Sequence, residues 1–161
     1  MNAEADFPYL RRSPLTIGLT DNQVELLAGI AYCRRLNDEE VLIQEGQIDN
    51  SLHIIAEGGI AVTREMGKGD YATIHVLRTG DLAGEMGFIS GQPHTATLRS
   101  MGNTQVCSLE RAAFEDLLPE NPWLIYRVMQ NIVQVSQDIL RRMNAQHVEL
   151  TKYVYRSHAL Y

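Results

Sequence analysis

Residues 84–97 read GEMGFISGQPHTAT, and no other stretch of the chain says as much about its fold. A glycine and a carboxylate come before a short apolar turn, which predicts a helix start whose backbone N–H groups face a bound anion. Gly84 and Gly87 permit a close approach of the backbone to a ligand. Glu85 is then free to accept a hydrogen bond from a sugar hydroxyl. The pattern indicates a binding site for a sugar phosphate and not a catalytic one.

The same stretch resembles the phosphate-binding cassette of cyclic nucleotide-binding domains, in which Gly-Glu and a small or apolar pair precede Pro-Arg, a small residue and Ala-Thr. The resemblance covers roughly residues 20–145 and includes VLIQEG at 41–46, SLHIIAEG at 51–58, Gly80-Asp81 and Leu109-Glu110-Arg111. It implies a mainly β fold with flanking helices. The expected fold is a double-stranded β-helix (jelly roll) with an N-terminal helix and a long C-terminal helix, as in catabolite-activator-like sensor domains.

The resemblance also implies roles for individual residues. In the family, the cassette carboxylate binds the ribose 2′-hydroxyl, backbone amides of the short helix hold the cyclic phosphate, and the arginine neutralises its charge. By position, the expected ligand-binding residues are Gly84, Glu85, Met86, Gly87, His94, Thr95 and Ala96. The family's long helix also contacts the base, which makes Arg141 and Arg142 further candidates. Arginines late on an amphipathic helix are, however, usually solvated or placed near its C-terminal dipole.

Pro93-His94 stands where the family usually has Pro-Arg. Histidine lacks the planar fork of donors that suits phosphate, and imidazoles are only partly protonated at neutral pH. Losing a charge-assisted hydrogen bond costs roughly 1.5 to 3 kcal/mol, or about tenfold to hundredfold in affinity. His94 is therefore a pH-dependent phosphate contact, a relic or determinant for another ligand, or a plain surface histidine.

Composition bounds the class of protein. The chain has 161 residues, 45% of them apolar and 21% charged, which describes one ordinary globular domain. A formal net charge of -6 disfavours nonspecific binding to nucleic acids. The sequence shows neither a secretory signal nor a run of transmembrane length. Cys33 and Cys107 lack any ligand spacing and are predicted to be two separate thiols, so a cytoplasmic location is expected.

The chain divides into three parts by its patterns. Residues 1–18 are expected to form a flexible N-terminal arm, residues 19–145 the cyclic nucleotide-binding-like domain with its long C-terminal helix, and residues 146–161 the helix end and tail. A capping box at Thr20 and Gln23 predicts a helix over 21–34. Short strands are expected at 40–44, 52–56, 60–64, 71–78, 95–99 and 105–109, with turns at 57–59 and 67–70. A short helix over 112–118 precedes the long helix, which begins near Pro122.

Apolar residues recur along the long helix at steps of three and four, as in a coiled-coil seam. The eight seam positions are Ile125, Met129, Ile132, Ser136, Ile139, Met143, Gln146 and Leu150. The seam predicts a homodimer, as in the regulators that the chain resembles. The alternative is that the helix packs on its own roll.

Other chemistries find little support. The spacing of the five histidines does not match a metal site: they are His53, His75, His94, His147 and His158. No nucleophilic triad, P-loop or dinucleotide-binding fingerprint is visible. No metal, no cofactor and no enzymatic activity are therefore expected. A haem or redox sensor on the same fold, with His75 as a haem ligand, is a third alternative. The chain as given has no helix-turn-helix, so DNA is not an expected partner. A membrane is not an expected partner either, because the sequence shows no run of transmembrane length.

The expected function is a regulatory sensor that binds a cyclic nucleotide of the cAMP or cGMP type, or a related anion, and signals through a C-terminal dimer helix. The alternative is a degenerate domain that serves as a dimerisation or protein-interaction scaffold. The substituted arginine keeps that alternative open.

Overall fold

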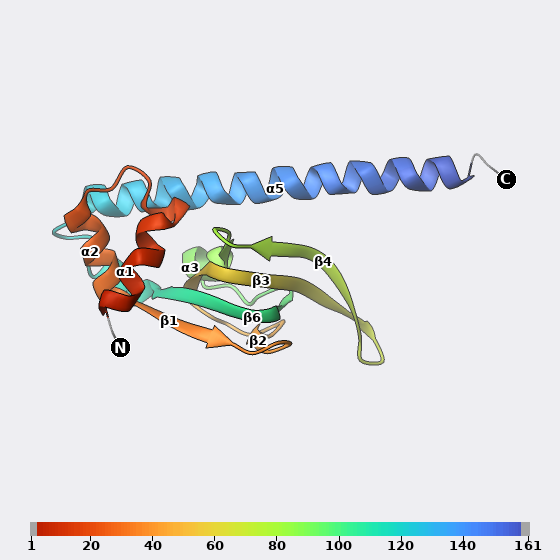
Figure 1. The fold of residues 1–161 in the computed structure, drawn as a ribbon, viewed down its shortest axis with the longest axis horizontal. Helices are drawn as coiled ribbons and strands as arrows, with labels where there is room; N and C mark the ends of the chain where they lie inside the picture. The colour runs from red at the N-terminus through yellow and green to blue at the C-terminus, as the bar shows by residue number, and fades with distance from the viewer. Residues whose placement is uncertain (1–2, 159–161) are drawn as a thin grey trace.

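The structure is a computed structural model that describes residues 3–158 of the chain. A curved antiparallel β-roll lies beneath one long helix, and two short helices close the end of the roll near the start of that helix (Figure 1). The fold class expected from the sequence is confirmed. In chain order the elements are α1 (Ala3–Arg12), η1 (Pro14–Thr16), α2 (Asp21–Ile30), β1 (Ala31–Leu36), β2 (Val41–Ile43), β3 (Ser51–Gly67), β4 (Asp70–Arg78), β5 (Leu82–Ala83), α3 (Glu85–Ser90), β6 (Thr97–Glu110), α4 (Arg111–Glu115) and α5 (Pro122–His158).

Two long strands organise the roll. β6 pairs with β1, β2 and β3, and β3 also pairs with β4 and β5, all antiparallel. The turn expected at 57–59 is instead a bulge inside β3, where the register with β6 shifts. Gly58 has a φ of +83°, and a Cβ there would lie 2.7 Å from the Asn103 carbonyl oxygen. Glycine therefore lets the strand bend without ending.

The turn expected at 67–70 is confirmed as a hairpin. β3 ends at Gly67 and β4 begins at Asp70. Lys68 and Gly69 between them have φ values of 56° and 82°. Two consecutive residues with positive φ match the twist of the strands that they join.

The first helix of the domain is shorter than expected. The predicted capping box of Thr20 and Gln23 is present, and α2 begins at Asp21 directly after Thr20, but the helix ends at Ile30 and not at residue 34. Residues 31–36 form β1 because they pair along their whole length with β6. Tertiary pairing thus overrides the local helical pattern.

Cys33 and Cys107 form a disulfide that joins β1 to β6 across 74 residues of sequence. The prediction of two separate thiols is wrong. The antiparallel register places the two residues directly opposite each other, and sequence spacing alone does not reveal that register.

The N-terminal segment is docked and not a loose arm over its described part. Leu10 and Leu15 are 1% and 0% exposed in the core. The Asn131 side-chain amide of α5 donates hydrogen bonds to the carbonyl oxygens of Leu15 and Ile17, at 2.8 and 2.9 Å. The burial of these two leucines was not predicted, because the stretch is polar in its overall composition.

α5 runs along the whole roll and continues past it (Figure 1). At 1.5 Å per residue, its 37 residues span about 55 Å. Ile132 and Ile139 of the predicted seam are buried in the core of the domain, whereas Gln146 and Leu150 are exposed. The central part of the seam therefore packs on its own roll. Among the described residues, no helix is long and apolar enough to span a membrane.

Candidate functional site

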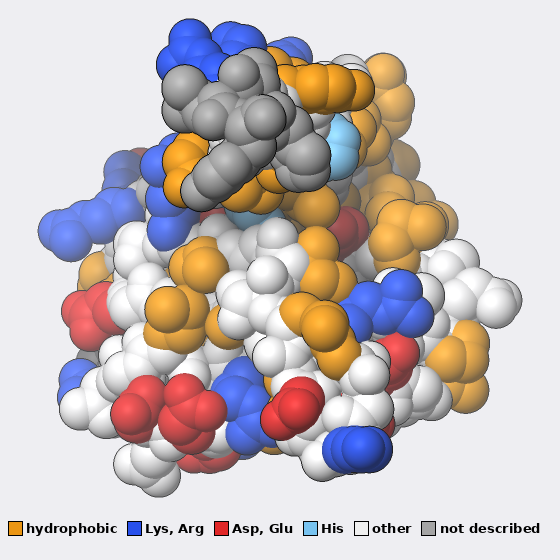
Figure 2. Space-filling model, turned by 90° about the vertical axis from the view of Figure 1, so that its right-hand side faces the viewer, with side chains coloured by type: hydrophobic (Ala, Val, Ile, Leu, Met, Phe, Trp, Pro, Cys, Tyr) orange, Lys and Arg blue, Asp and Glu red, His pale blue; other side chains and the backbone are white. Residues whose placement is uncertain are grey.

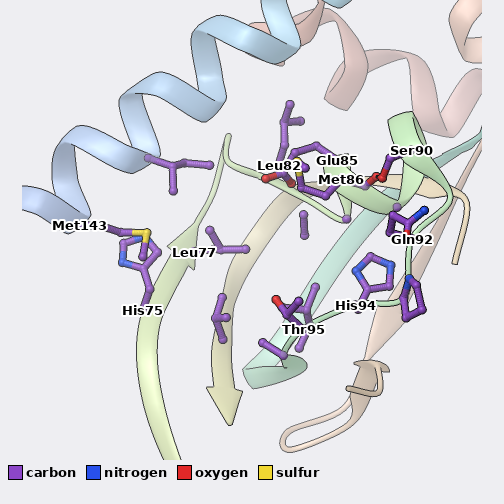
Figure 3. A pocket seen from close by; sticks show the side chains of 18 residues that line it. His75, Leu77, Leu82, Glu85, Met86, Ser90, Gln92, His94, Thr95 and Met143 are labelled. Atoms are coloured by element: carbon purple, nitrogen blue, oxygen red, sulfur yellow. The ribbon is translucent and has the colours of Figure 1, made fainter. Parts of the chain in front are cut away.

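A cavity of about 460 Å³ lies between the roll, α3 and α5 (Figure 3). This volume falls within the range of small-molecule sites, roughly 300 to 1,000 Å³. All seven main candidates from the sequence line it: Gly84, Glu85, Met86, Gly87, His94, Thr95 and Ala96. The structure therefore brings the seven predicted site residues together around one cavity.

Gly84 sets the start of α3. It has a φ of 80°, in the left-handed region, and a Cβ there would lie 2.8 Å from the Ser51 carbonyl oxygen. Only glycine fits this turn without strain. The helix begins at Glu85, and the N–H groups of its first turn have no acceptor within the helix. These amides are the donors that an anion in the cavity could use.

Glu85 is the acidic side chain that lines the cavity. Burial raises the pKa of its carboxyl above the ordinary value, although its own backbone N–H and the nearby His94 ring act in the opposite direction. A half-buried carboxylate with no lysine or arginine among the cavity-lining residues needs hydrogen-bond donors. A ligand hydroxyl would supply one.

Gly87 lies where α3 meets the loop that precedes β3. A Cβ on Gly87 would lie 2.7 Å from His94 Nε2 and still closer to the Asp49 carbonyl oxygen. The glycine thus makes room for the imidazole ring beneath the helix. Any other residue here would displace His94 or α3.

His94 is held by three contacts with that loop. Its backbone N–H donates to Gln47 at 2.9 Å, and its carbonyl accepts from the Gly46 N–H at 2.7 Å. Its ring Nε2 lies 3.2 Å from the Asp49 carbonyl oxygen. The position that carries arginine in the family is therefore occupied by a fixed, half-buried imidazole ring.

A hydrogen-bond network with the buried residues His53 and Ser108 holds the side chain of Asp49. His53 Nε2 lies 3.2 Å from the Asp49 carboxylate, and His53 Nδ1 lies 2.7 Å from Ser108 Oγ. Burial alone would raise the pKa of Asp49, but the hydrogen bonds from His53 and the Ser51 backbone outweigh it and lower the pKa to about 2. Ser108 is fully buried, so this Asp-His-Ser arrangement holds the loop and offers no accessible nucleophile.

The far end of the cavity is apolar except for one histidine. Figure 3 shows His75, Leu77 and Met143 there, on the side away from His94. The other large apolar side chains that line the cavity are Val62, Leu82, Leu98 and Ile139. The sequence suggested a role for His75 only as a haem ligand. No group of three or more metal-ligating side chains lies together in the part of the chain that the structure describes. The signal that the sequence did offer is strand alternation, since His75 and Leu77 both face inward on β4.

The two arginine candidates on α5 do not line the cavity. Arg141 is exposed and pairs with Asp138 at 2.9 Å. Arg142 reaches the roll, where its guanidinium donates to the Asp81 carboxylate at 2.5 Å. Asp81 also accepts from the Arg78 N–H at 2.9 Å. Arg142 therefore ties α5 to the loop between β4 and β5.

Comparison with known proteins identifies the family of the chain. Residues 33–121, more than half of the chain, match the family model of the cyclic nucleotide-binding domain. The chain belongs to the cyclic nucleotide-binding domain family. Domains of this family are ligand-binding regulatory modules and are typical of cAMP sensors.

Two curated relatives show the breadth of the family. A cAMP-dependent protein kinase regulatory subunit of Dictyostelium discoideum is 33% identical over 100 residues, which are 60% of this chain and 31% of that protein. The cAMP-activated global transcriptional regulator of Escherichia coli is 26% identical over 128 residues, which are 79% of this chain and 54% of the regulator. The chain thus spans about a third to about half of these relatives' length.

Solved structures share the fold of this cyclic nucleotide-binding domain. A cyclic nucleotide-binding domain from Methylobacillus flagellatus matches with a TM-score of 0.82 and 23% identity, over 91% of this chain and 85% of that one. The regulatory domain of Toxoplasma gondii protein kinase A, crystallised with cAMP, matches with a TM-score of 0.66 and 19% identity, over 82% and 50% of the two chains. Both confirm the architecture around the cavity.

Proposed function

We propose that this domain is a sensor that binds a cyclic mononucleotide of the cAMP type in the cavity and reports its occupancy through α5. One observation carries the proposal: the predicted site residues line one cavity, with the half-buried carboxylate of Glu85, the imidazole of His94 and the first turn of α3 together. This combination suits a ligand that carries both a sugar hydroxyl and a phosphate.

At the polar end of the cavity, different protein groups bind different parts of the ligand. The cyclic phosphate accepts hydrogen bonds from the first-turn amides of α3, near the positive end of the helix. The ribose hydroxyl donates to Glu85, which stabilises the ionised carboxylate. His94 supplies a positive charge when it is protonated. The base then extends toward the apolar end.

α5 is the element that can report occupancy. Ile139 and Met143 on α5 line the cavity, so a ligand touches the helix directly. The same stretch is tied to the roll by the ion pair between Arg142 and Asp81. A ligand that prefers one position of α5 shifts the population toward that position.

The proposal includes a homodimer through α5. Tyr126, Val133 and Leu140 follow one another at seven-residue steps and are 56%, 51% and 55% exposed. Such a stripe is typical of a helix that packs against a second helix. Hydrophobic side chains also gather around the protruding end of α5, above a roll surface of mixed charges (Figure 2). The exposed apolar residues of that end are Val148, Leu150, Tyr153, Val154 and Tyr155.

The alternative function is a domain that no longer binds nucleotide and serves as a scaffold for dimerisation or protein interaction. One observation favours it. His94 replaces the arginine, and its Nε2 already has a partner in the Asp49 carbonyl oxygen. The exposed apolar stripe of α5 fits this alternative equally well.

Calorimetric titration tests the two functions against each other. The ligands are cAMP, cGMP and a cyclic dinucleotide, and the proteins are the wild type, Glu85→Ala and the control Glu120→Ala, which changes an exposed glutamate outside the cavity. We expect the wild type and the control to bind a cyclic mononucleotide, and Glu85→Ala to bind it about tenfold to hundredfold more weakly. Absence of heat with every ligand would favour the scaffold.

The proposal also places the sensor in the cytoplasm, as expected from the sequence. In a reducing compartment, a bond such as that between Cys33 and Cys107 persists only if its reduction potential is low enough. Counting free thiols in protein isolated under a thiol-blocking reagent tests this part of the proposal. Full protection of both cysteines from the reagent would point to an oxidising compartment.

A further inference from the structure

His75 is a buried polar residue in the apolar end of the cavity. It lies on β4, is 5% exposed and lines the cavity together with Leu77 and Met143 (Figure 3). Its Nε2 atom is buried and has no hydrogen-bond partner among the described residues. Buried polar atoms are nearly always paired, so an unpaired one calls for a partner that the folded chain does not supply.

Gln146 fixes which nitrogen of His75 carries the proton. His75 Nδ1 lies 3.3 Å from Gln146 Oε1. The amide oxygen can only accept, so Nδ1 must be the donor. The neutral ring then has a lone pair at Nε2. His75 therefore holds an unused acceptor behind a wall that is otherwise apolar, and a group in the cavity reaches this buried atom only when a neighbouring side chain such as Met143 moves.

Within the described part of the chain, no protein donor faces this acceptor. The other side chains at this end are apolar, and none of the described lining residues is a lysine or an arginine. His94 lies at the other end of the cavity, beside Thr95 and Gln92 (Figure 3). Met143, at the same end as His75, has a flexible thioether side chain that can repack around a bound group. The missing donor must come from the ligand.

We propose that His75 Nε2 accepts a hydrogen bond from the exocyclic amino group of a purine base, and that Gln146 positions it for this role. The inference rests on the proposed function, because phosphate and sugar at the cassette leave the base at this end. An adenine-type base donates through its 6-amino group. A base with hydrogen or a carbonyl oxygen at that position leaves the lone pair of Nε2 without a partner.

The probes are cAMP and purine riboside 3′,5′-cyclic monophosphate, which lacks only the 6-amino group. The wild type is expected to bind cAMP about tenfold more tightly than the deamino compound. In His75→Leu this ratio is expected to fall close to one, with the affinity for the deamino compound retained. A tenfold ratio that survives in His75→Leu would overturn the proposal.

A second variant acts through Gln146, which is exposed on α5 and can be changed without disturbing the core. Gln146→Glu places a carboxylate beside Nδ1 and favours the imidazolium, whose Nε2 donates instead of accepting. We expect the preference to move from cAMP toward cyclic IMP, whose 6-oxo group accepts. An unchanged preference contradicts a positioning role for Gln146. Nitrogen-15 NMR of the ligand-free wild type should show the Nδ1–H tautomer, and an Nε2–H tautomer would refute the assignment.

The outcomes separate this inference from the proposed function. Equal affinity of the wild type for cAMP and the deamino compound overturns the role of His75 and leaves the cyclic nucleotide site in place. Absence of binding to both compounds overturns the proposed function, and the inference with it.

Discussion

The Nε2 atom of His94 lies 3.2 Å from the backbone carbonyl oxygen of Asp49. A carbonyl only accepts, so Nε2 carries the proton in this contact. In the neutral ring, Nδ1 then holds a lone pair, which repels a phosphate oxygen. Protonation turns Nδ1 into a second donor and adds a positive charge. The histidine that replaces the family's arginine therefore favours an anion only in its charged form.

Glu85→Gln should separate binding from stability. Because burial raises the pKa of Glu85, its ionised form destabilises the ligand-free fold at pH values above that pKa. The neutral amide removes this cost, so thermal unfolding of the ligand-free variant at pH 7.5 should begin at a higher temperature. The same change should weaken cAMP binding about tenfold, since a charged acceptor for the sugar hydroxyl is lost.

The matched control for this change is Glu120→Gln, at an exposed position outside the cavity. It should alter neither the melting temperature nor the affinity. A melting temperature that falls in Glu85→Gln would show that the ionised carboxylate stabilises the empty site, contrary to this account.

Gly87→Ala should damage the site through a single methyl group. A Cβ at this position would lie 2.7 Å from His94 Nε2 and closer still to the Asp49 carbonyl oxygen. Such overpacking typically costs about 1 to 3 kcal/mol and should displace His94 or α3. We expect a lower free energy of unfolding in urea and a loss of cAMP binding of at least about tenfold.

Gly29→Ala is the control for Gly87→Ala. Gly29 lies inside α2, and a Cβ there would meet nothing within 4 Å. Alanine should stabilise this helix by about 0.5 to 1 kcal/mol and leave binding unchanged. If both variants were equally stable and bound cAMP equally well, the close approach at Gly87 would have no role.

The disulfide between Cys33 and Cys107 should contribute to stability. It closes a loop across 74 residues, and bonds of this kind typically contribute about 2 to 4 kcal/mol. Adding a reductant should therefore lower the free energy of unfolding by about that amount. A double variant, Cys33→Ala with Cys107→Ala, should start at the lower value and not respond to the reductant. A wild type indifferent to reductant would contradict this prediction.

Val133→Asp with Leu140→Asp should abolish a dimer formed through α5. Both residues are about half exposed, so the charges should leave the monomer folded. We expect sedimentation to show a dimer for the wild type and a monomer for the variant. Ile132 and Ile139, from the seam expected in the sequence, are buried in the core, so aspartates there would test folding instead.

The control for the dimer places charges on another side of the same helix. Gln134 and Arg141 are exposed and, at 100° per residue, point away from the stripe of Val133 and Leu140. Gln134→Glu with Arg141→Glu should keep the dimer. A wild type that sediments as a monomer at high concentration would refute the dimer outright.

The cassette, the hairpin at 67–70 and the long helix could be predicted from the sequence because each depends on local chemistry. Glycines mark the turns, and the helical repeat of α5 extends over many residues. Glu85 and His94 could be named as candidates for the same reason: they belong to one continuous motif.

The remaining features depend on residues that meet only after folding. β1 exists because it pairs with β6, and that register also brings Cys33 opposite Cys107. The role of Asp49 in holding His94 is carried by a backbone carbonyl, which no residue type reveals. The role proposed for His75 depends on its contact with Gln146, 71 residues away in the sequence. No local pattern encodes these contacts.

Calorimetric titration of the wild type with cAMP at pH 6.0 and pH 7.5, beside His94→Arg, tests the central claim most directly. A protonated His94 donates to the phosphate and adds a positive charge, whereas a neutral one does not. The contribution of Glu85 is lost as pH falls through its raised pKa, and it is the same in both proteins. Arginine stays charged at both values. We predict binding by both proteins, tighter in His94→Arg than in the wild type at pH 7.5 by about tenfold or more, and a smaller difference between the two proteins at pH 6.0. Absence of binding by both proteins at both pH values would contradict the cyclic nucleotide site.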